Sequence, residues 1–267
     1  MLISVIITTY NSPNFLKKCL NSFLVQKDKN FEIIIADDGS TKETKQLIDN
    51  YRNKKLIVNH AWHKDEGFRA AKIRNEAVKL SSGDYLVFVD GDCVVFNDFI
   101  ENHRKLAEPG FFARGNRAML SKFSSCKIVD DNIDINLIST IDFIKLRFKK
   151  NINRIIPILR FINYPLRKII KKKWKGAKTC NLGVWKKDFE NINGYDESYI
   201  GWGREDSDLV VRLINNNIFR KEAIFSTGLL HLKHEINSRE NFTKNDKLLN
   251  EAINKNKTYI KNGYIKS

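Results

Sequence analysis

The first hundred residues alternate short apolar runs with amphipathic segments, and this alternation constrains the fold more than any other feature of the chain. Four of the runs are rich in β-branched residues and apolar nearly throughout, as expected for strands covered by helices on both faces. Strands and helices that alternate in this way are typical of βαβ units and of an α/β fold with a mostly parallel sheet. The predicted strands are residues 3–8, 31–36, 56–59 and 85–90.

Three helices are predicted between these strands. A Ser-Pro pair opens the first, and apolar residues recur at helical spacing through residues 13–24. Ser40 followed by Glu43 fits a capping box, so a second helix is expected to begin directly after the second strand. The third helix is predicted over residues 69–80, where the apolar residues share one face.

Acidic residues end two of the predicted strands, at the edge of the sheet where open parallel sheets bind ligands. Carboxylates gathered there would repel one another unless a cation compensated them. Asp90 and Asp92 are one glycine apart and can offer hard oxygen ligands to Mg²⁺ or Mn²⁺. A lone Asp-x-Asp is more often a pair of solvated turn aspartates, but its position after a buried strand favours a metal site.

Asp37 and Asp38 follow the second strand and allow two interpretations. They could form a turn and cap the next helix. A carboxylate at this strand end could instead accept the N–H of a nucleobase, with Tyr10 supplying a stacking face.

Four segments in the first third of the chain together resemble the inverting family 2 glycosyltransferases of GT-A fold. The resemblance implies a Rossmann-like, mostly parallel central sheet flanked by helices and fused to an acceptor-binding lobe. It further implies that Thr8, Tyr10 and Asp38 hold the uridine of a UDP-sugar donor. The segments are residues 5–11, 35–40, 67–75 and 88–92, in the expected order.

The same resemblance implies that Asp90, Gly91 and Asp92 hold the metal, Mn²⁺ or Mg²⁺, and the diphosphate of the donor. It assigns Arg69 or Arg74 to the phosphates or the sugar. Arg74 has a structural alternative, in which it pairs with a carboxylate of the acidic sheet edge.

Segments of the second half resemble the galactosyltransferase-type C-terminal segment of bacterial capsule and chondroitin-polymerase-like transferases, core-oligosaccharide transferases and animal galactosyltransferases. By this resemblance Asp206 is the general base, Glu205 recognises the acceptor and Trp202 offers an apolar face to a sugar. In the alternative, Glu205, Asp206 and Asp208 only cap the helix that follows them. The segments are residues 181–188, 193–197 and 201–208.

Two histidines follow this helix, His231 and His234. In many related enzymes a histidine in this region completes the metal shell, and the match of Lys233-His234 favours His234 as the ligand. The other histidine is expected to bind no metal. An imidazole ligand would favour Mn²⁺ over Mg²⁺.

The chain is strongly basic, with 47 Lys and Arg against 31 Asp and Glu and a formal net charge of +16. This charge suits nucleic acid, an anionic membrane or phosphate-bearing ligands. A nucleic-acid partner is not expected, because the cations concentrate at residues 167–175 and in the tail, away from the acidic motifs. A nucleotidyltransferase would normally carry a glycine-rich phosphate loop near its N-terminus, and the sequence has none there.

Residues 138–175 are predicted to form a helical insertion with a basic, partly apolar surface. One hypothesis places this surface on an anionic membrane beside a lipid-linked glycan acceptor, and the alternative is a solvated helix face. No stretch reaches the roughly 18 uninterrupted apolar residues of a spanning helix. Four unpatterned cysteines and the absence of a signal-like leader predict a cytoplasmic protein. The membrane hypothesis would place it on the inner face of the membrane.

One continuous catalytic domain is expected. Residues 1–100 would be its nucleotide-sugar-binding half, residues 101–236 its acceptor and catalytic half, and residues 237–267 a C-terminal extension. The predicted activity is metal-assisted transfer of a sugar, hexosyl or N-acetylhexosaminyl, to a hydroxyl of a cell-surface glycan or lipid-linked acceptor.

Overall fold

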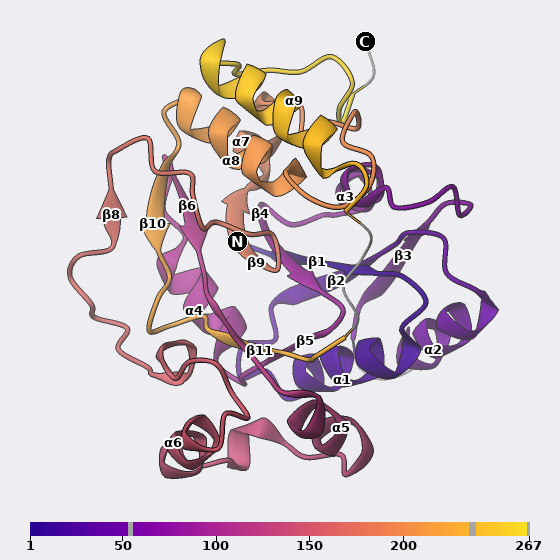
Figure 1. The fold of residues 1–267 in the computed structure, drawn as a ribbon, viewed down its shortest axis with the longest axis vertical. Helices are drawn as coiled ribbons and strands as arrows, with labels where there is room; N and C mark the ends of the chain where they lie inside the picture. Colours follow the sequence, from indigo (N-terminus) through magenta and orange to yellow (C-terminus); the bar gives the residue numbers. More distant parts are fainter. Residues whose placement is uncertain (53–55, 235–238, 266–267) are drawn as a thin grey trace.

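A large mixed sheet forms the centre of the protein, with helices on both faces (Figure 1). The computed structural model describes residues 1–52, 56–234 and 239–265. In the eight-stranded sheet the strands lie in the order β3-β2-β1-β4-β9-β6-β10-β8. These strands are β1 Ile3–Thr9, β2 Phe31–Asp37, β3 Val58–Trp62, β4 Tyr85–Asp90, β6 Phe111–Arg114, β8 Lys168–Ile169, β9 Asn181–Trp185 and β10 Phe219–Glu222.

A second, three-stranded sheet has the order β5-β11-β7. Its strands are β5 Cys93–Val95, β7 Arg117–Met119 and β11 Leu229–His231. The longer helices are α1 Pro13–Leu24, α2 Lys42–Arg52, α3 Ala70–Lys79, α4 Phe99–Leu106, α5 Lys122–Asp130, α6 Thr140–Phe148, α7 Lys186–Asn191, α8 Glu205–Asn215 and α9 Phe242–Asn254. In Figure 1, α8 and α9 lie together at the top and α5 and α6 at the bottom.

Both faces of the main sheet are buried, which explains the continuous apolar runs of the sequence. Val5 and Ile7 pack in one core cluster with residues of α1, α2 and α4. Ile6 packs in a second cluster with residues of α3, α7 and α8. Because β1, β2, β3 and β4 pair in parallel, their carboxyl ends lie at one edge. The expected GT-A-like α/β architecture with helices on both faces of the sheet is confirmed.

The third strand differs from its prediction. It spans Val58–Trp62 rather than residues 56–59, and Ile57 is exposed. His60 interrupts the apolar pattern of this strand, and its Nε2 lies 2.9 Å from Asp37 Oδ2 on the neighbouring strand. The pair of His60 and Asp37 thus takes the place of an apolar contact between β3 and β2, and without an apolar residue at position 60 the sequence pattern does not predict the strand there.

The predicted capping box is also wrong. The Ser40 hydroxyl accepts the N–H of Asn11 at 2.8 Å, and α2 begins only at Lys42. Asn11 has a left-handed φ of 43°, and its side chain accepts the N–H of Thr41 at 2.9 Å. Ser40 therefore ties the end of β1 to the end of β2 instead of capping the helix.

The predicted helical insertion over residues 138–175 is helical only in its first part, at α6 and a short 3-10 turn, Ile156–Ile158. The basic run after it is not helical, and Lys168–Ile169 pairs as β8 with β10. Its first residue, Arg167, is buried and donates to the carbonyls of Glu222 and Ile224 at 2.7 and 2.8 Å. These bonds from the Arg167 side chain to backbone carbonyls fix the start of the run at the sheet edge.

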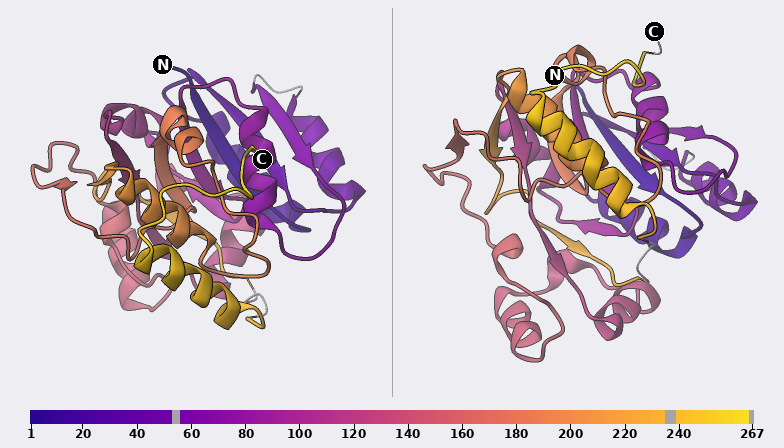
Figure 2. Two further views of the ribbon diagram at one scale, coloured as in Figure 1. Left: turned by 90° about the horizontal axis from the view of Figure 1, so that it is seen from above. Right: turned by 45° about the horizontal axis from the view of Figure 1, so that its top comes forward.

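The tail folds back as α9, the yellow helix in both views of Figure 2, which packs against α8. Asn245 of α9 is buried and donates to the carbonyls of Ile200 and Gly203 at 3.2 and 3.0 Å. The predicted boundary between residues 236 and 237 lies outside the described residues. Across the described ranges, the helices are all too short or too polar to span a membrane.

Candidate active site

The ends of β1 and β2 form the first part of the site. Tyr10 is half exposed, and its hydroxyl donates to Asp65 Oδ2 at 2.8 Å. Asp38 is buried; its Oδ1 lies 2.7 Å from His63 Nε2, and its Oδ2 accepts the backbone N–H of Arg69 at 2.8 Å. Burial raises the pKa of Asp38, and these two donors act against that rise. His63 and Asp65 follow β3 and were not singled out in the sequence.

Asp37, the neighbour of Asp38, points into the protein. Its Oδ1 accepts the N–H of Ser40 at 2.8 Å, and its Oδ2 faces His60. Of the two interpretations of this acidic pair, Asp37 therefore follows the turn-forming one, whereas Asp38 lies at the sheet edge near Tyr10.

Arg74 of α3 connects two strands and one helix that carry predicted site residues, β1, β4 and α8. Its Nε donates to Thr8 Oγ1 at 2.9 Å, and its two terminal nitrogens lie 3.1 Å from Glu205 Oε1 and 3.5 Å from Asp90 Oδ1. Arg74 is buried, with 5% of its surface exposed. The guanidinium thus makes the carboxylate pairing that was its structural alternative, and it places the start of α8 beside the end of β4.

Arg69 is the more accessible of the two arginines assigned to the phosphates or the sugar. Its side chain is 32% exposed, against 6% for Arg74, and pairs with Glu66 at 2.9 Å. An exposed ion pair of this kind contributes little to stability, so the Arg69 guanidinium is free to exchange partners at low energetic cost.

Asp92, His231 and His234 converge at the three-stranded sheet. Asp92 Oδ2 lies 2.9 Å from His234 Nε2, and Asp92 Oδ1 lies 3.4 Å from His231 Nε2. One ligand atom from each residue lies within 4.8 Å of the others, which is compact enough for a single metal ion. The pairing of β11 with β5 sets this geometry, because it brings His231 opposite Cys93, next to Asp92.

The hydrogen bonding of His231 favours a metal here. Its Nδ1 lies 2.9 Å from the Leu232 carbonyl oxygen, which can only accept, so Nδ1 carries the proton. In the neutral imidazole, Nε2 then carries a lone pair that faces the Asp92 carboxylate. Nε2 and the carboxylate are both acceptors, and they repel each other unless a cation lies between them. Burial lowers the pKa of His231, against the opposing effect of the Asp92 carboxylate. A carboxylate with two imidazoles suits a transition metal such as Mn²⁺ better than Mg²⁺.

The structure places Asp90 apart from this cluster. Its carboxylate faces Arg74, and burial and the nearby Asp92 raise its pKa. Gly91, between the two acids, donates its N–H to the Thr8 carbonyl at 2.8 Å, and a Cβ there would lie 3.1 Å from the same oxygen. This close approach of the backbone turns Asp90 and Asp92 towards different partners.

The start of α8 is strained where the Gly-Trp-Gly motif meets it. Arg204 occupies the N-cap position with a left-handed φ of 81° and no side-chain cap bond. Asp208 is buried and its Oδ2 accepts from Arg212 at 2.8 Å, so it stabilises the helix internally. Asp206 is half-buried and its Oδ1 accepts the Ser207 hydroxyl at 3.2 Å. Asp206 and Asp208 therefore each accept a hydrogen bond from another side chain of α8.

Trp202 is partly covered by the C-terminal helix. Its ring stacks on that of Phe242 with centroids 5.9 Å apart and planes 25° apart, and Arg239 lies over it at 5.0 Å. Trp202 remains half-buried, so the sugar-facing role stays a prediction that would use the part of the ring outside this stack.

Burial of Glu205 and the nearby charge of Asp206 raise the pKa of Glu205 to about 7, against the opposing effect of Arg74. Its Oε2 makes no hydrogen bond within the described part of the chain. A carboxyl whose folded-state pKa exceeds its unfolded value stabilises the fold fully below about pH 4.5, and that stabilisation is lost as the pH rises through about 7.

We expect the stability of Glu205→Gln relative to the wild type to increase as the pH rises. From pH 5 to pH 8 the difference in unfolding free energy should shift towards the variant by roughly 2 kcal/mol, because Gln stays neutral. Urea denaturation in EDTA at both pH values measures this shift. Exposed Glu43→Gln serves as the control, and equal pH dependence in both variants would contradict the prediction.

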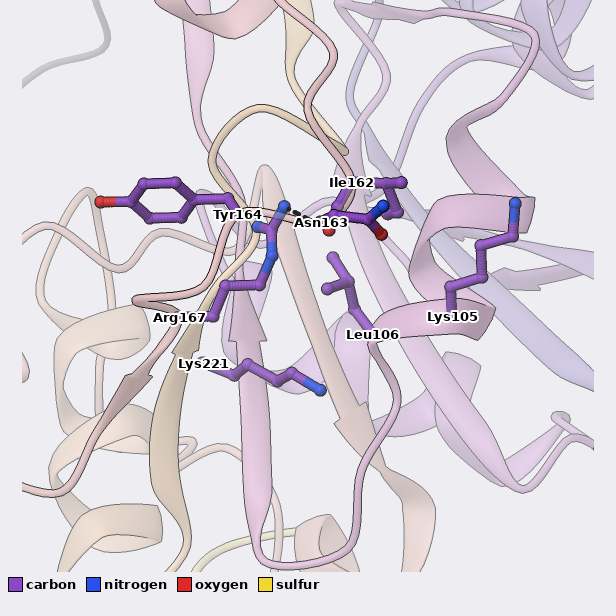
Figure 3. Close-up of a pocket in the computed structure, with 7 residues that line it drawn as sticks. All are labelled: Lys105, Leu106, Ile162, Asn163, Tyr164, Arg167 and Lys221. Carbon is purple, nitrogen blue, oxygen red and sulfur yellow. Dashed lines mark hydrogen bonds between the residues drawn. The ribbon is translucent and has the colours of Figure 1, made fainter.

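A large cavity lies elsewhere, among the residues drawn in Figure 3. Its volume is about 630 Å³, and its lining includes three cations, Lys105, Arg167 and Lys221. Each cation already has a partner: Lys105 bonds to Glu101, Arg167 to backbone carbonyls, and Lys221 to Glu108. The cavity shares no lining residue with the candidate site.

The chain matches two protein families. Residues 4–117 match the family described as "Glycosyl transferase family 2", and residues 167–235 match "N-terminal domain of galactosyltransferase". Among curated proteins, validoxylamine A glucosyltransferase of Streptomyces hygroscopicus subsp. jinggangensis is 26% identical over 226 residues, covering 79% of this chain and 51% of that protein. The chain thus spans about half the length of this relative.

A shorter match is poly(ribitol-phosphate) beta-N-acetylglucosaminyltransferase TarS of Staphylococcus aureus, 37% identical over 94 residues, 34% of this chain and 16% of TarS. The structure of TarS 1–349 with UDP-GlcNAc superposes with a TM-score of 0.61 at 18% identity, covering 93% of this chain and 65% of that one. The mannosyltransferase PcManGT of Pyrobaculum calidifontis, in complex with GDP-Man and Mn²⁺, gives 0.58 at 16% identity, covering 87% and 57%.

The acidic strand ends, the Gly-Trp-Gly helix start and the two family matches agree in order along the chain. The protein therefore has the GT-A fold, in which residues 4–117 match family 2 glycosyltransferases and residues 167–235 match a galactosyltransferase domain.

Proposed function

We propose that this protein is an inverting glycosyltransferase that moves a sugar from a nucleotide-diphosphate donor to a hydroxyl of an acceptor. The observation that carries the proposal is the Arg74 guanidinium, which contacts both Asp90 after β4 and Glu205 at the start of α8. This contact brings the acidic motif of the first half beside the acidic motif of the second half, where Asp206 lies.

Asp206 is the proposed general base. It lies in the first turn of α8, directly after Glu205. A carboxylate oxygen of Asp206 can take the proton of the acceptor hydroxyl as the hydroxyl oxygen attacks the anomeric carbon. Glu205, bonded to Arg74, positions the start of α8 and is the proposed contact to the acceptor.

Asp92, His231 and His234 are the residues proposed to hold the divalent cation, with Mn²⁺ preferred. When bound, such an ion neutralises the charge that develops on the departing diphosphate. Asp90 and Gly91 are proposed to lie beside the diphosphate, and Arg69 supplies the accessible cation for the phosphates.

The proposed donor is a UDP-sugar. Tyr10, Asp38 and Thr8 at the ends of β1 and β2 supply an aromatic face and a buried acceptor for a nucleobase N–H. The structural likeness to TarS in complex with UDP-GlcNAc and the family match support this choice. The proposed acceptor is a cell-surface glycan or a lipid-linked oligosaccharide, approached at an anionic membrane surface.

A screen of nucleotide sugars tests the proposal. We expect one UDP-sugar to be hydrolysed slowly in the presence of Mn²⁺, because water can replace the acceptor. EDTA should abolish this hydrolysis and added Mn²⁺ should restore it, as measured by release of the nucleoside diphosphate. Failure of every UDP-, GDP- and CDP-sugar to bind or react would contradict the proposed function.

A further inference from the structure

The side of α6 that faces solvent is apolar. Ile141, Ile144 and Phe148 are 65%, 38% and 84% exposed, and their spacing places them on one side of the helix. Leu137, in the 3-10 turn Ile135–Leu137 before the helix, is 84% exposed. We call these four side chains the α6 face. Single exposed apolar residues are common, but four neighbouring ones mark a surface that binds something.

The other side of α6 holds the helix to the protein. Phe143 is buried, and Leu146 packs against the same core cluster. Because the helix is apolar on both sides, core packing explains Phe143 and Leu146 but leaves the α6 face unexplained.

The charges around the α6 face select an anionic partner. Residues 140–154 contain five basic residues and one acidic residue, a net charge of 5 − 1 = +4, and the acid, Asp142, bonds to Lys145 at 3.1 Å. An apolar strip flanked by cations is the pattern of a helix that lies in a membrane interface. A second copy of this chain, with a net charge of +16, would instead bring like charges together.

A second apolar and basic segment follows along the same side of the protein. In Figure 1 the chain runs from α6 up the left edge to β8. Phe161, Leu166 and Ile170 are 59%, 75% and 67% exposed, and the exposed lysines 171–173 come directly after them. Lysines 171–173 therefore add cations on the same side of the protein as the α6 face.

The α6 face is joined to the candidate metal site through the core. Ile135 and Phe143 pack in one cluster with Leu230 and Leu232, which flank His231. On the neighbouring α5, the Ser125 hydroxyl accepts the N–H of Lys233 at 2.7 Å, next to His234. A membrane or other external surface that bound α6 would therefore lie close to the candidate metal site.

We propose that α6 is an interfacial helix that inserts the α6 face into an anionic lipid bilayer, with its lysines and arginines at the headgroups. The inference deepens the proposed function by naming the surface that brings the site to a lipid-linked acceptor, and the binding itself requires no catalysis.

Vesicle sedimentation tests the proposal. The full chain should bind vesicles of phosphatidylcholine mixed with phosphatidylglycerol, and bind phosphatidylcholine alone much more weakly. The double variant Ile141→Ser/Phe148→Ser should partition into anionic vesicles at least about tenfold less, because each buried apolar side chain adds severalfold to the affinity. Ile57→Ser, 63% exposed before β3, is the matched control and should bind like the wild type.

A charge variant provides an independent measurement. Lys149→Gln/Lys150→Gln keeps the α6 face and should lose about fivefold in binding for each cation near the anionic surface. Circular dichroism would confirm that both double variants fold. Equal binding of wild type and Ile141→Ser/Phe148→Ser, or no binding of the wild type, would overturn the proposal.

Two further measurements separate the remaining outcomes. Light scattering without lipid that showed a wild-type dimer and a monomeric Ile141→Ser/Phe148→Ser, with no vesicle binding, would identify the face as a contact between copies and overturn the proposal. Donor hydrolysis in solution should be unchanged in the variants. If hydrolysis were absent in every form while vesicle binding followed the α6 face, the proposed function would fail and this inference would stand.

Discussion

Asp206→Asn should lower kcat by about two to four orders of magnitude, the usual effect of removing a general base. Asn has nearly the same shape as Asp and can still accept the Ser207 hydroxyl, so α8 should keep its start. It cannot take a proton from the acceptor at neutral pH. Because the substitution leaves the nucleotide edge and the Asp92 cluster intact, donor affinity should be unchanged. Steady-state kinetics and calorimetric titration of the donor measure the two quantities.

Asp246→Asn is the matched control for this experiment. Asp246 lies on α9, is 39% exposed and pairs with Arg204 at 2.7 Å, directly before α8. Its substitution removes a negative charge from the same end of α8 without touching the proposed base, so kcat should stay at the wild-type value. Normal turnover by Asp206→Asn, or equal losses in the two variants, would show that Asp206 is not the base.

Asp92→Ala should weaken Mn²⁺ binding more than about 100-fold, since even residues that only support a metal ligand cost 10- to 100-fold when removed. Asp92 is the residue that both histidines face, so its loss leaves two imidazoles without a shared carboxylate. Donor affinity should fall with it in the presence of Mn²⁺ and stay unchanged in EDTA. Titration calorimetry with Mn²⁺ and then with the donor measures both effects.

Asp84→Ala is the control, because Asp84 is exposed at the opposite end of β4. The histidines are compared in the same assay. If His231→Ala and His234→Ala both weaken Mn²⁺ binding, the ion has three protein ligands. A loss in His234→Ala alone would leave His231 as a buried structural histidine, and Mn²⁺ binding by Asp92→Ala at wild-type affinity would remove the metal site altogether.

The strands and the acidic edge could be predicted from the sequence because each depends on a local pattern. Two-sided burial makes β1, β2 and β4 apolar nearly throughout, apart from the buried pair Ser4 and Glu32, and the polar residues at the end of each run mark where it ends. The galactosyltransferase-type segment was likewise a continuous string of residues. Positions such as Asp38 and Asp92 follow directly from these patterns.

The partners of those residues could not be predicted, because they come from distant parts of the chain. Arg74 and Glu205 are 131 residues apart, and Asp38 meets His63 only because β3 pairs with β2. His231 gave no signal stronger than that of His234 until β11 was placed against β5. A local pattern sets which residues end a strand, whereas strand order decides what they face.

The insertion shows why composition was a poor guide to conformation. Residues 138–175 are rich in Ile, Leu, Lys and Arg, which favour helices in isolation. The structure keeps an α-helix only in α6 and leaves the basic run non-helical, because Arg167 donates to carbonyls at the end of β10 and just after it. Tertiary contacts of one buried cation outweigh the intrinsic preference of its neighbours.

The position of β9 also affects how the protein is made. β9 lies between β4 and β6 and is antiparallel to both, with Asn181 opposite Val89 and Gly183 opposite Ala113. While the ribosome is still adding the residues between β4 and β9, the nascent β4 has an open hydrogen-bonding edge of five buried residues followed by one acid. Such an edge can pair with a neighbouring nascent chain, so the pairing of β9 with β4 is the step until which a chaperone would protect this fold.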